Sequence, residues 1–346
     1  MAERTLTHTR TQAPHAFPTG SGVLRAFMDK HFLHFNSRET VAAAMAYERH
    51  VESGGKMMVT LAGAMSTARI GQTLARMIRE EKVHAITSTG ANLEEDLFVL
   101  LAGNEYEHCP QWRELTAQQE AALRNRGMNR VTDTCIPETV MRDLEGQLMK
   151  RWRAASQDGQ RKMPYEYLFE IVLSGDLDSH CQLPPEESWV VAAAEKDIPI
   201  YTPGWEDSTT GNIFTAEVIL GNIPHHQCVT SGTEQMEALV GWYQENCNQD
   251  GSGPSVGFFQ IGGGIAGDFS ICAVPLIIQD LKKRDTRFWD YFCQISDAVT
   301  SYGGYSGAVP NEKITWGKLD EDTPKFMIQS DASIVAPLMF GYILGD

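Results

Sequence analysis

Short apolar runs alternate with helical patterns along much of this chain. Residues 56–61 and 83–87 are apolar runs, and a helical pattern through Arg79 lies between them. Apolar runs of this length, bounded by turns, are typical of strands buried on both faces of a parallel sheet. Upstream, residues 38–53 predict a helix with Ser37 as a candidate N-cap.

The alternation continues further along the chain. Residues 88–92 form a predicted loop, and another helix begins near Leu93. Further strands are predicted at residues 198–202, 255–261 and 325–328, each followed by a polar or glycine-rich loop. This order predicts an α/β fold with a doubly wound, mainly parallel sheet.

Composition and linkers favour one large domain over residues 21–346. No linker rich in Pro, Gly or Ser divides the chain, and no repeat is visible. Residues 105–160 are more charged and contain a longer helix near residues 138–154, which predicts a helical insertion or cover. Residues 1–20 are polar and lack the apolar core of a secretion signal, so we expect a mobile tail there.

Charge and cysteine content narrow the classes of partner. The formal net charge of −16 disfavours nucleic acid, which needs a basic surface, and is compatible with a cationic ligand or simply with solubility. No apolar run approaches the ~18–20 residues of a membrane span. The seven cysteines form no Cys-x-x-Cys pair, which favours a reduced, cytoplasmic location.

The loops after the predicted strands hold the candidate chemistry. Ligands of open α/β sheets bind beyond the carboxyl ends of the strands. There the chain has glycines that let a dinucleotide approach the backbone, and carboxylates that accept ribose hydroxyls. The strict Gly-x-Gly-x-x-Gly spacing is absent, so each glycine taken alone is a turn residue. These positions are Gly63, Gly90, Glu95, Asp207, residues 262–264 and Asp331.

A second candidate is the segment from Tyr302 to Lys318, a glycine loop that runs into Trp-Gly-Lys. A lysine becomes a nucleophile when a crowded, apolar site favours its neutral amine. Trp316 and Glu312 would suit an aliphatic ammonium ligand. The alternative is a plain surface lysine. Lys313 is a rival nucleophile, but its neighbour Glu312 predicts a solvated ion pair instead.

Four blocks of the chain together resemble the deoxyhypusine synthase family, in the same order over residues 25–346. The Glu-Glu-Asp block and the Trp-Gly-Lys block are specific, and the triple glycine is not. Weaker support comes from residues 34–39 and 126–130. The blocks are residues 87–96, 199–212, 261–269 and 303–318, with residues 330–332 behind them.

The resemblance implies an NAD-dependent 4-aminobutyl transferase. In the family, NAD takes a hydride from spermidine, 1,3-diaminopropane leaves, and a lysine holds the butylamine as a Schiff base. The acceptor is a lysine of a translation factor or, in homospermidine synthases, putrescine. Sites lie at subunit interfaces, usually in homotetramers.

By resemblance, Lys318 is the Schiff-base lysine, and Trp316, Glu95 and Glu312 meet the polyamine. The positions that match the NAD site are Gly63, Thr89, Gly90, Asp207, Gly263, Ser306 and Asp331.

The chain departs from the family pattern near the substrate. Asp268 and Phe269 stand where a histidine pair is usual, and Asn212, Tyr302 and Tyr305 stand where carboxylates are expected. Asp268, Tyr305 and Asn212 remain candidate substrate contacts, and the changes favour a small amine such as putrescine over a protein lysine as acceptor. The same changes leave a non-catalytic NAD- or polyamine-binding protein as the alternative.

No metal site is predicted. His225–His226 and His180–Cys181 are pairs without a third ligand at metal spacing.

Overall fold

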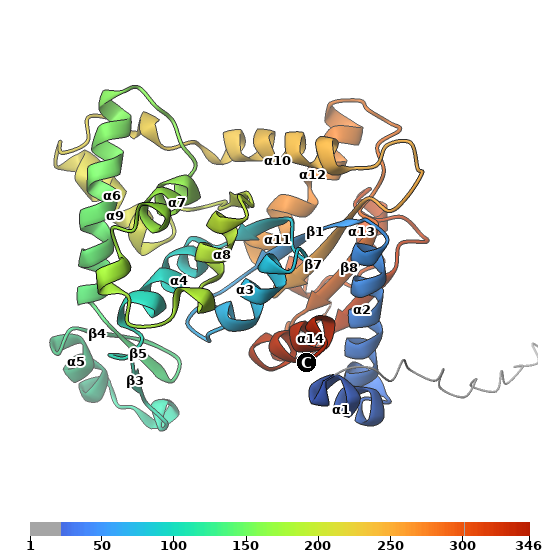
Figure 1. The fold of residues 1–346 in the computed structure, drawn as a ribbon, viewed down its shortest axis with the longest axis horizontal. Helices are drawn as coiled ribbons and strands as arrows, with labels where there is room; N and C mark the ends of the chain where they lie inside the picture. Colours follow the sequence, from blue (N-terminus) through green and yellow to red (C-terminus); the bar gives the residue numbers. More distant parts are fainter. Residues whose placement is uncertain (1–21, 301) are drawn as a thin grey trace, which may run out of the picture.

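The centre of the fold is a six-stranded sheet of order β6-β2-β1-β7-β8-β9, in which every neighbouring pair is parallel (Figure 1). The computed structural model describes residues 22–300 and 302–346, so the predicted tail at residues 1–20 lies outside the described residues. The doubly wound parallel sheet is confirmed. Its strands are β1 (Lys56–Leu61), β2 (Ala85–Ser88), β6 (Ile200–Tyr201), β7 (Val256–Ile261), β8 (Tyr291–Ile295) and β9 (Lys325–Ile328).

The strand order sets the place where a ligand can bind. From β1 the chain builds outward through β2 and β6, then returns to the other side of β1 with β7, β8 and β9. The direction of winding therefore reverses between β1 and β7. In open α/β sheets the crevice beyond the carboxyl ends of the strands at such a reversal is the usual ligand site.

Alternate residues of the central strands face two hydrophobic cores, as the two-residue repeat of a strand requires. Met57 and Val59 belong to the larger core, whereas Met58 belongs to the smaller one. The larger core contains residues of α2 (Phe35–Glu52), α3 (Gly71–Arg79) and α14 (Ala332–Leu344). The smaller contains residues of α10 (Gly232–Asn246), α11 (Gly264–Ile271) and α12 (Ala273–Pro275). Both faces of the sheet are thus covered, which explains why its strands are continuous apolar runs.

The remaining longer helices pack together beside the β2–β6 edge, where α4 contacts α6, α8 and α9 (Figure 1). α1 precedes α2 and packs on α14. α1 comprises Val23–His31, and the helices that pack together at the edge are α4 (Gly90–Ala102), α6 (Thr139–Gln157), α7 (Pro164–Ser174), α8 (Trp189–Glu195) and α9 (Thr209–Ile219).

Several predicted boundaries were wrong by a few residues. α2 begins at Phe35 with His34 as its N-cap, and the hydroxyl of Ser37 donates to the carbonyl of His34 from inside the first turn. α4 begins at Gly90 rather than near Leu93, because the side chain of Thr89 caps it by accepting from the Asn92 amide at 3.2 Å. The strand predicted at residues 198–202 is observed only at Ile200–Tyr201 (β6). The strand predicted at residues 83–87 is observed at Ala85–Ser88 (β2).

The strands of two regions were not predicted. β8 is the fifth strand of the main sheet, and it has a short apolar run that follows a charged stretch. Residues 105–160, expected to be a helical insertion, also contain a three-stranded antiparallel sheet of order β3-β5-β4 beside α5 (Ala117–Asn125). Its strands are β3 (Glu107–His108), β4 (Met128–Val131) and β5 (Thr134–Pro137).

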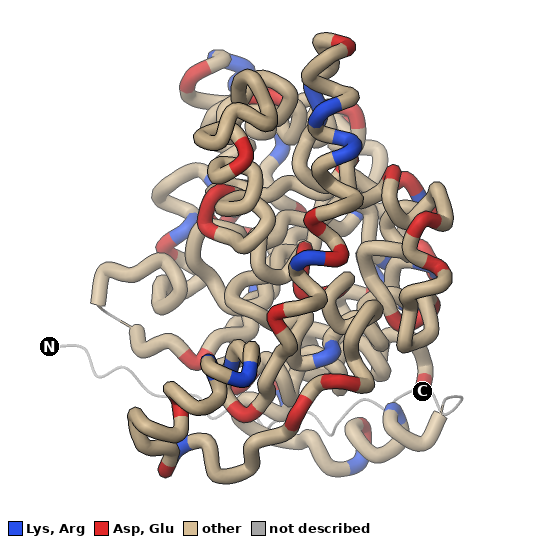
Figure 2. Tube along the Cα trace, turned by 90° about the vertical axis from the view of Figure 1, so that its left-hand side faces the viewer, with Lys and Arg blue, Asp and Glu red and all other residues tan. Residues whose placement is uncertain are grey.

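Charged positions are distributed along the whole visible trace in Figure 2 rather than gathered by sign. Within the described ranges, no helix has the length and apolar character needed to cross a membrane.

Candidate active site

The backbone of Lys318 is held from both sides. It follows α13 (Glu312–Thr315), and Gly317 has a φ of 68°, a left-handed conformation that allows the chain to turn there. The Lys318 amide donates to the carbonyl of Lys313 at 3.1 Å, and the Lys318 carbonyl accepts from the Trp289 amide at 3.3 Å. The next residue, Leu319, is buried in the smaller core. These contacts fix the direction in which the Lys318 side chain leaves the backbone.

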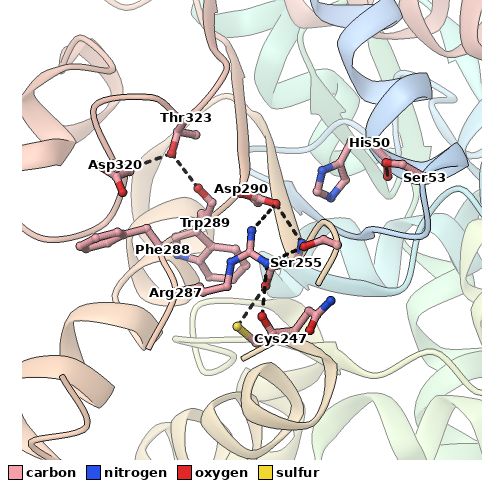
Figure 3. A network of polar contacts seen from close by, with 12 residues as sticks. His50, Ser53, Cys247, Ser255, Arg287, Phe288, Trp289, Asp290, Asp320 and Thr323 are labelled. Atoms are coloured by element: carbon pink, nitrogen blue, oxygen red, sulfur yellow. Dashed lines mark hydrogen bonds and ion pairs between the residues drawn. The ribbon is translucent and has the colours of Figure 1, made fainter. Parts of the chain in front are cut away.

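Trp289, just before β8, extends this support into a wider network (Figure 3). Its indole nitrogen donates to the carbonyl of Ile271 at 3.1 Å, and its own carbonyl accepts from the Thr323 hydroxyl at 3.1 Å. In the same network Asp290 accepts from Arg287 at 3.1 Å. The segment from Lys318 to Thr323 is therefore tied to the residue just before the amino end of β8.

The side chain of Lys318 lies in a cavity of about 290 Å³. Its Nζ lies 2.9 Å from Oδ1 of Asp268 on α11. It also lies 5.2 Å from the ring centroid of Tyr305 and 6.0 Å from that of Trp316, which is within cation–π range. Glu312 lines the same cavity. The structure thus brings together the predicted residues Lys318, Asp268, Tyr305, Glu312 and Trp316.

Two buried glutamines hold the loop that carries Tyr305, within the 3₁₀ turn η6 (Tyr305–Gly307). The Tyr305 hydroxyl donates to Oε1 of Gln260 on β7 at 2.7 Å. The amide of Gln294 on β8 donates to the carbonyl of Ser306 at 2.8 Å. Burial raises the pKa of Tyr305 well above its ordinary value, so its hydroxyl remains a donor at neutral pH. The aromatic wall of the cavity is therefore fixed to the sheet.

The prediction that Lys313 is solvated was wrong. Only 2% of the residue is exposed, and its Nζ donates to the carbonyl of Ala308 at 3.0 Å. It also lines the cavity of Lys318. Burial, followed by the charge of Lys318, lowers the pKa of Lys313 to about 8. Glu312 and Lys313 are consecutive on α13, and consecutive helical side chains do not face each other.

Cys272, at the end of α11, also lines this cavity and was not predicted. Its Sγ lies 3.7 Å from Oδ1 of Asp268. Burial is the main cause that raises the pKa of the Cys272 thiol, which therefore stays protonated at neutral pH. Its position four residues after Asp268 on one helix was the signal that could have found it.

A second cavity, of about 260 Å³, lies at the reversal of winding between β1 and β7. The predicted residues Gly63 and Asp331 line it, together with Gly262. Gly63 has a φ of 63° with no atom near its missing Cβ, so the backbone there is open to a ligand. Asp331 accepts from the Ser333 amide through Oδ1 at 2.8 Å. Asp297, which follows the unpredicted β8, is also in the lining.

Gly263 and Ser306 contact each other, and each is next in sequence to a cavity residue, Gly262 of the second cavity and Tyr305 of the Lys318 cavity. The amide of Gly264, at the start of α11, donates to the Ser306 hydroxyl at 3.1 Å. A Cβ on Gly263 would lie 2.1 Å from that hydroxyl oxygen, so only glycine fits. The N-cap residue of α11, Gly263, has no side chain to cap the first turn, and the Ser306 hydroxyl takes one amide of that turn. The amino end of α11 can therefore receive an anion such as a phosphate.

The other predicted cofactor positions lie at the carboxyl ends of β2 and β6. The Thr89 hydroxyl donates to the carbonyl of Gly63 at 2.8 Å, which connects this group to the second cavity. A Cβ on Gly90 would lie 2.5 Å from Cβ of Ser208, so the two loops are in close contact. Asp207 is exposed in the adjoining loop. Glycine-lined loops and a free helix terminus together suit a dinucleotide.

Three consecutive buried carboxylates on α4 have different partners. Glu94 accepts from the amides of Thr209 and Thr210 at 2.8 and 2.7 Å, and Asp96 accepts from Val190 at 3.0 Å. These two residues thus cap α9 and α8. Glu95 accepts from the Thr67 hydroxyl, and burial raises the pKa of Glu95 to about 7.

Two predicted substrate residues, Glu95 and Asn212, are not among the residues that line the Lys318 cavity. The side-chain amide of Asn212 donates to the carbonyl of Ser208 at 2.6 Å, within the first turn of α9. In one chain these two positions are therefore separate from the lysine. Among residues 22–300 and 302–346, no group of three or more side chains could hold a metal ion.

Known proteins that are similar to this chain identify its family. A family model described as deoxyhypusine synthase matches residues 26–343. A "Deoxyhypusine synthase-like protein" of Cyanothece sp. is 28% identical over 96% of this chain and 82% of its own length. A "Probable deoxyhypusine synthase 1" of Archaeoglobus fulgidus is 26% identical over 90% of each chain.

Among solved structures, "a putative deoxyhypusine synthase from Entamoeba histolytica" matches with a TM-score of 0.54 and 12% identity, over 89% of this chain and 87% of that chain. At this identity the likeness concerns the fold.

Proposed function

This chain belongs to the deoxyhypusine synthase family, and from that premise we propose that it is an NAD-dependent 4-aminobutyl transferase. Its donor is spermidine or a related polyamine, and Lys318 carries the four-carbon unit as a Schiff base. The observation that carries the proposal is the buried Lys318 amine, oriented by Asp268 inside a cavity with aromatic walls. A lysine without a chemical role is usually exposed to solvent rather than buried beside a carboxylate and aromatic rings.

The residues around the second cavity would hold NAD. Gly63 leaves its backbone open to the dinucleotide, whereas Gly90 and Gly263 let neighbouring loops pack closely around the site. The amino end of α11 favours the phosphates. Asp331 and Asp207 would accept from ribose hydroxyls, and Thr89 and Ser306 would complete the polar lining. When bound, NAD supplies an acceptor for the hydride of the donor amine.

The polyamine is recognised through carboxylates and aromatic faces. Glu312 is exposed at the Lys318 cavity, and Trp316 is 62% exposed beside it. Both can receive an ammonium group from the solvent side. Glu95 is a buried carboxylate, and an ammonium group would stabilise its charged form.

An oligomer accounts for the separation of Glu95 from Lys318 within one chain. We propose a homotetramer in which each active site forms at a subunit interface, so that the α4 carboxylate of one protomer faces the lysine cavity of another. Closed symmetric assemblies are the common form of soluble oligomers.

A small amine such as putrescine is the proposed acceptor. Asp268 already pairs with Lys318 and Tyr305 is neutral, so among the residues that line this cavity Glu312 is the carboxylate left for a further ammonium group. A protein lysine and a free diamine differ in charge and bulk, and the number of carboxylates tunes the choice between them.

The test is to incubate the chain with NAD, spermidine and putrescine and to identify every polyamine product by mass. The proposal predicts 1,3-diaminopropane together with a product that carries the transferred aminobutyl group. Spermidine that is bound but never consumed would instead support the non-catalytic alternative. If the chain modifies a translation-factor lysine efficiently and does not react with putrescine, the proposed acceptor is wrong but the proposed transferase activity stands.

A further inference from the structure

Two buried glutamines lie side by side on the neighbouring apolar strands β7 and β8. Gln260 and Gln294 are in register, and both are fully buried. Two residues earlier on each strand, Phe258 and Phe292 belong to the smaller hydrophobic core. An amide buried in such surroundings is costly unless its polar groups are hydrogen-bonded. The bonds that each glutamine makes therefore indicate why it is there.

The bonds of Gln260 fix the direction of its amide. Its Nε2 donates at 3.0 Å to the carbonyl of Gly262, which can only accept. Its Oε1 therefore faces the other way, where it accepts from the Tyr305 hydroxyl at 2.7 Å. A phenol has one proton to donate. Tyr305 gives that proton to Gln260 and presents its ring to the cavity, where the Lys318 Nζ lies 5.2 Å from the ring centroid.

Helix α11 packs directly against this hydrogen bond. A Cβ on Gly267 would lie 2.7 Å from Oε1 of Gln260 and 3.0 Å from Cε1 of Tyr305. Glycine at this position therefore allows the helix to approach both partners closely. The bond is enclosed between the sheet and the helix, which leaves the Gln260 side chain little room to turn.

We propose that Gln260 is a positioning residue that holds the ring of Tyr305 as an amine-binding wall of the Lys318 cavity. The inference rests on the proposed function, because Tyr305 is a proposed substrate contact. Tyr305 stands where a carboxylate is expected, so an amine meets an aromatic face there instead of an opposite charge. A ring that is held in place before binding loses less freedom when the amine arrives.

The second glutamine provides a matched control. Among the described residues, the Gln294 amide donates to the carbonyls of Gly262 and Ser306, at 3.1 and 2.8 Å, and not to Tyr305. If Gln260 is replaced, the Gly262 carbonyl therefore keeps a donor. Gly262 lines the second cavity, so that cavity should keep its shape. The loss should fall on amine binding and not on NAD.

The experiment is a double-mutant cycle on steady-state transfer with spermidine and NAD. It compares Gln260→Met, Tyr305→Phe and the double variant with the wild type. If Gln260 acts through the Tyr305 hydroxyl, each single variant should raise the KM for spermidine about fivefold, and the double variant should raise it no further. The kcat and the NAD dissociation constant should stay within about twofold of the wild type.

Gln294→Met removes an equally buried amide that makes no bond to the tyrosine within the described part of the chain. Its effect on the KM for spermidine should therefore multiply with that of Tyr305→Phe. The inference is overturned if the effects of Gln260→Met and Tyr305→Phe also multiply, or if Gln260→Met weakens NAD as much as spermidine. If Gln260→Met does not fold, an unchanged KM in Tyr305→Phe overturns it as well.

Failure of the inference is distinguishable from failure of the proposed function. Normal transfer with the same KM in every variant counts against Gln260 alone. A wild-type chain that binds spermidine in the presence of NAD but transfers nothing counts against the proposed function, and the cycle is then measured on the spermidine dissociation constant by calorimetry. A chain that does not bind spermidine overturns both.

Discussion

The Nζ of Lys318 lies 2.9 Å from Oδ1 of Asp268, and this contact joins the segment after α13 to α11. The lysine side chain is 9% exposed and the aspartate side chain 48%. A pair that is exposed on one side is partly screened by solvent and contributes modestly to stability. Its main consequence is chemical, because the carboxylate orients the amine and favours its charged form.

Asp268→Asn should make the Lys318 amine more reactive toward a simple reagent. Without the carboxylate, the charged form of the amine loses its ion-pair partner. We expect severalfold faster acetylation of Lys318 near pH 7.5. The unfolding free energy should change by no more than ~1 kcal/mol, because the carboxylate is half exposed. Asp285→Asn, in an exposed loop, is the matched control. Slower labelling of Lys318 in Asp268→Asn would contradict this role.

Spermidine binding should release a proton from Glu95. Burial raises the pKa of Glu95 to about 7, so much of this group is protonated at pH 6.5 when no ligand is bound. An ammonium group beside it lowers that pKa and expels roughly 0.7 of a proton. Calorimetric titrations at pH 6.5 in buffers of different ionisation enthalpy measure the release. Glu95→Gln should release none and bind more weakly. The same proton release in that variant would assign it to another group.

Gly263→Ala should disrupt both cavities. The new methyl group would lie 2.1 Å from the Ser306 hydroxyl oxygen, so the loop of Tyr305 and Ser306 must move. Overpacking of this kind costs ~1–3 kcal/mol of stability, and we expect NAD affinity to fall at least about tenfold. Gly232→Ala is the control, because its methyl group meets nothing within 4 Å. Fluorescence titration with NAD and thermal melting would check both effects, and unchanged NAD affinity would remove Gly263 from the cofactor site.

The periodic parts of the fold could be predicted from the sequence. Buried parallel strands are continuous apolar runs, so β1, β7 and β9 were located to within a residue. β8 was missed because its short run directly follows the charged stretch at residues 282–290. The sheet within residues 105–160 was missed because its strands are short and mostly polar.

The residues of the candidate active site were partly predictable from the sequence. Lys318 and Tyr305 were identified from one block and Asp268 from another, but only the fold shows that all three share a cavity. Lys313 was misjudged because adjacency in sequence was taken as contact with Glu312. On a helix that spacing turns the two side chains apart, and the burial of one of them depends on tertiary packing.

The chain should assemble as a homotetramer if its sites form between subunits. Sedimentation at micromolar concentration is expected to give four times the chain mass, and dilution should reduce transfer activity together with the tetramer fraction. Full activity in a monomer would contradict shared sites.

The most direct test of the central claim is borohydride trapping at Lys318. Wild-type protein incubated with NAD and spermidine and then reduced should carry one aminobutyl adduct, located at Lys318 by peptide mass spectrometry. Lys318→Ala and Lys318→Arg should carry none and should form no product, while still binding NAD, because neither side chain can form the imine. An adduct at another lysine, or normal product formation by Lys318→Ala, would contradict the account.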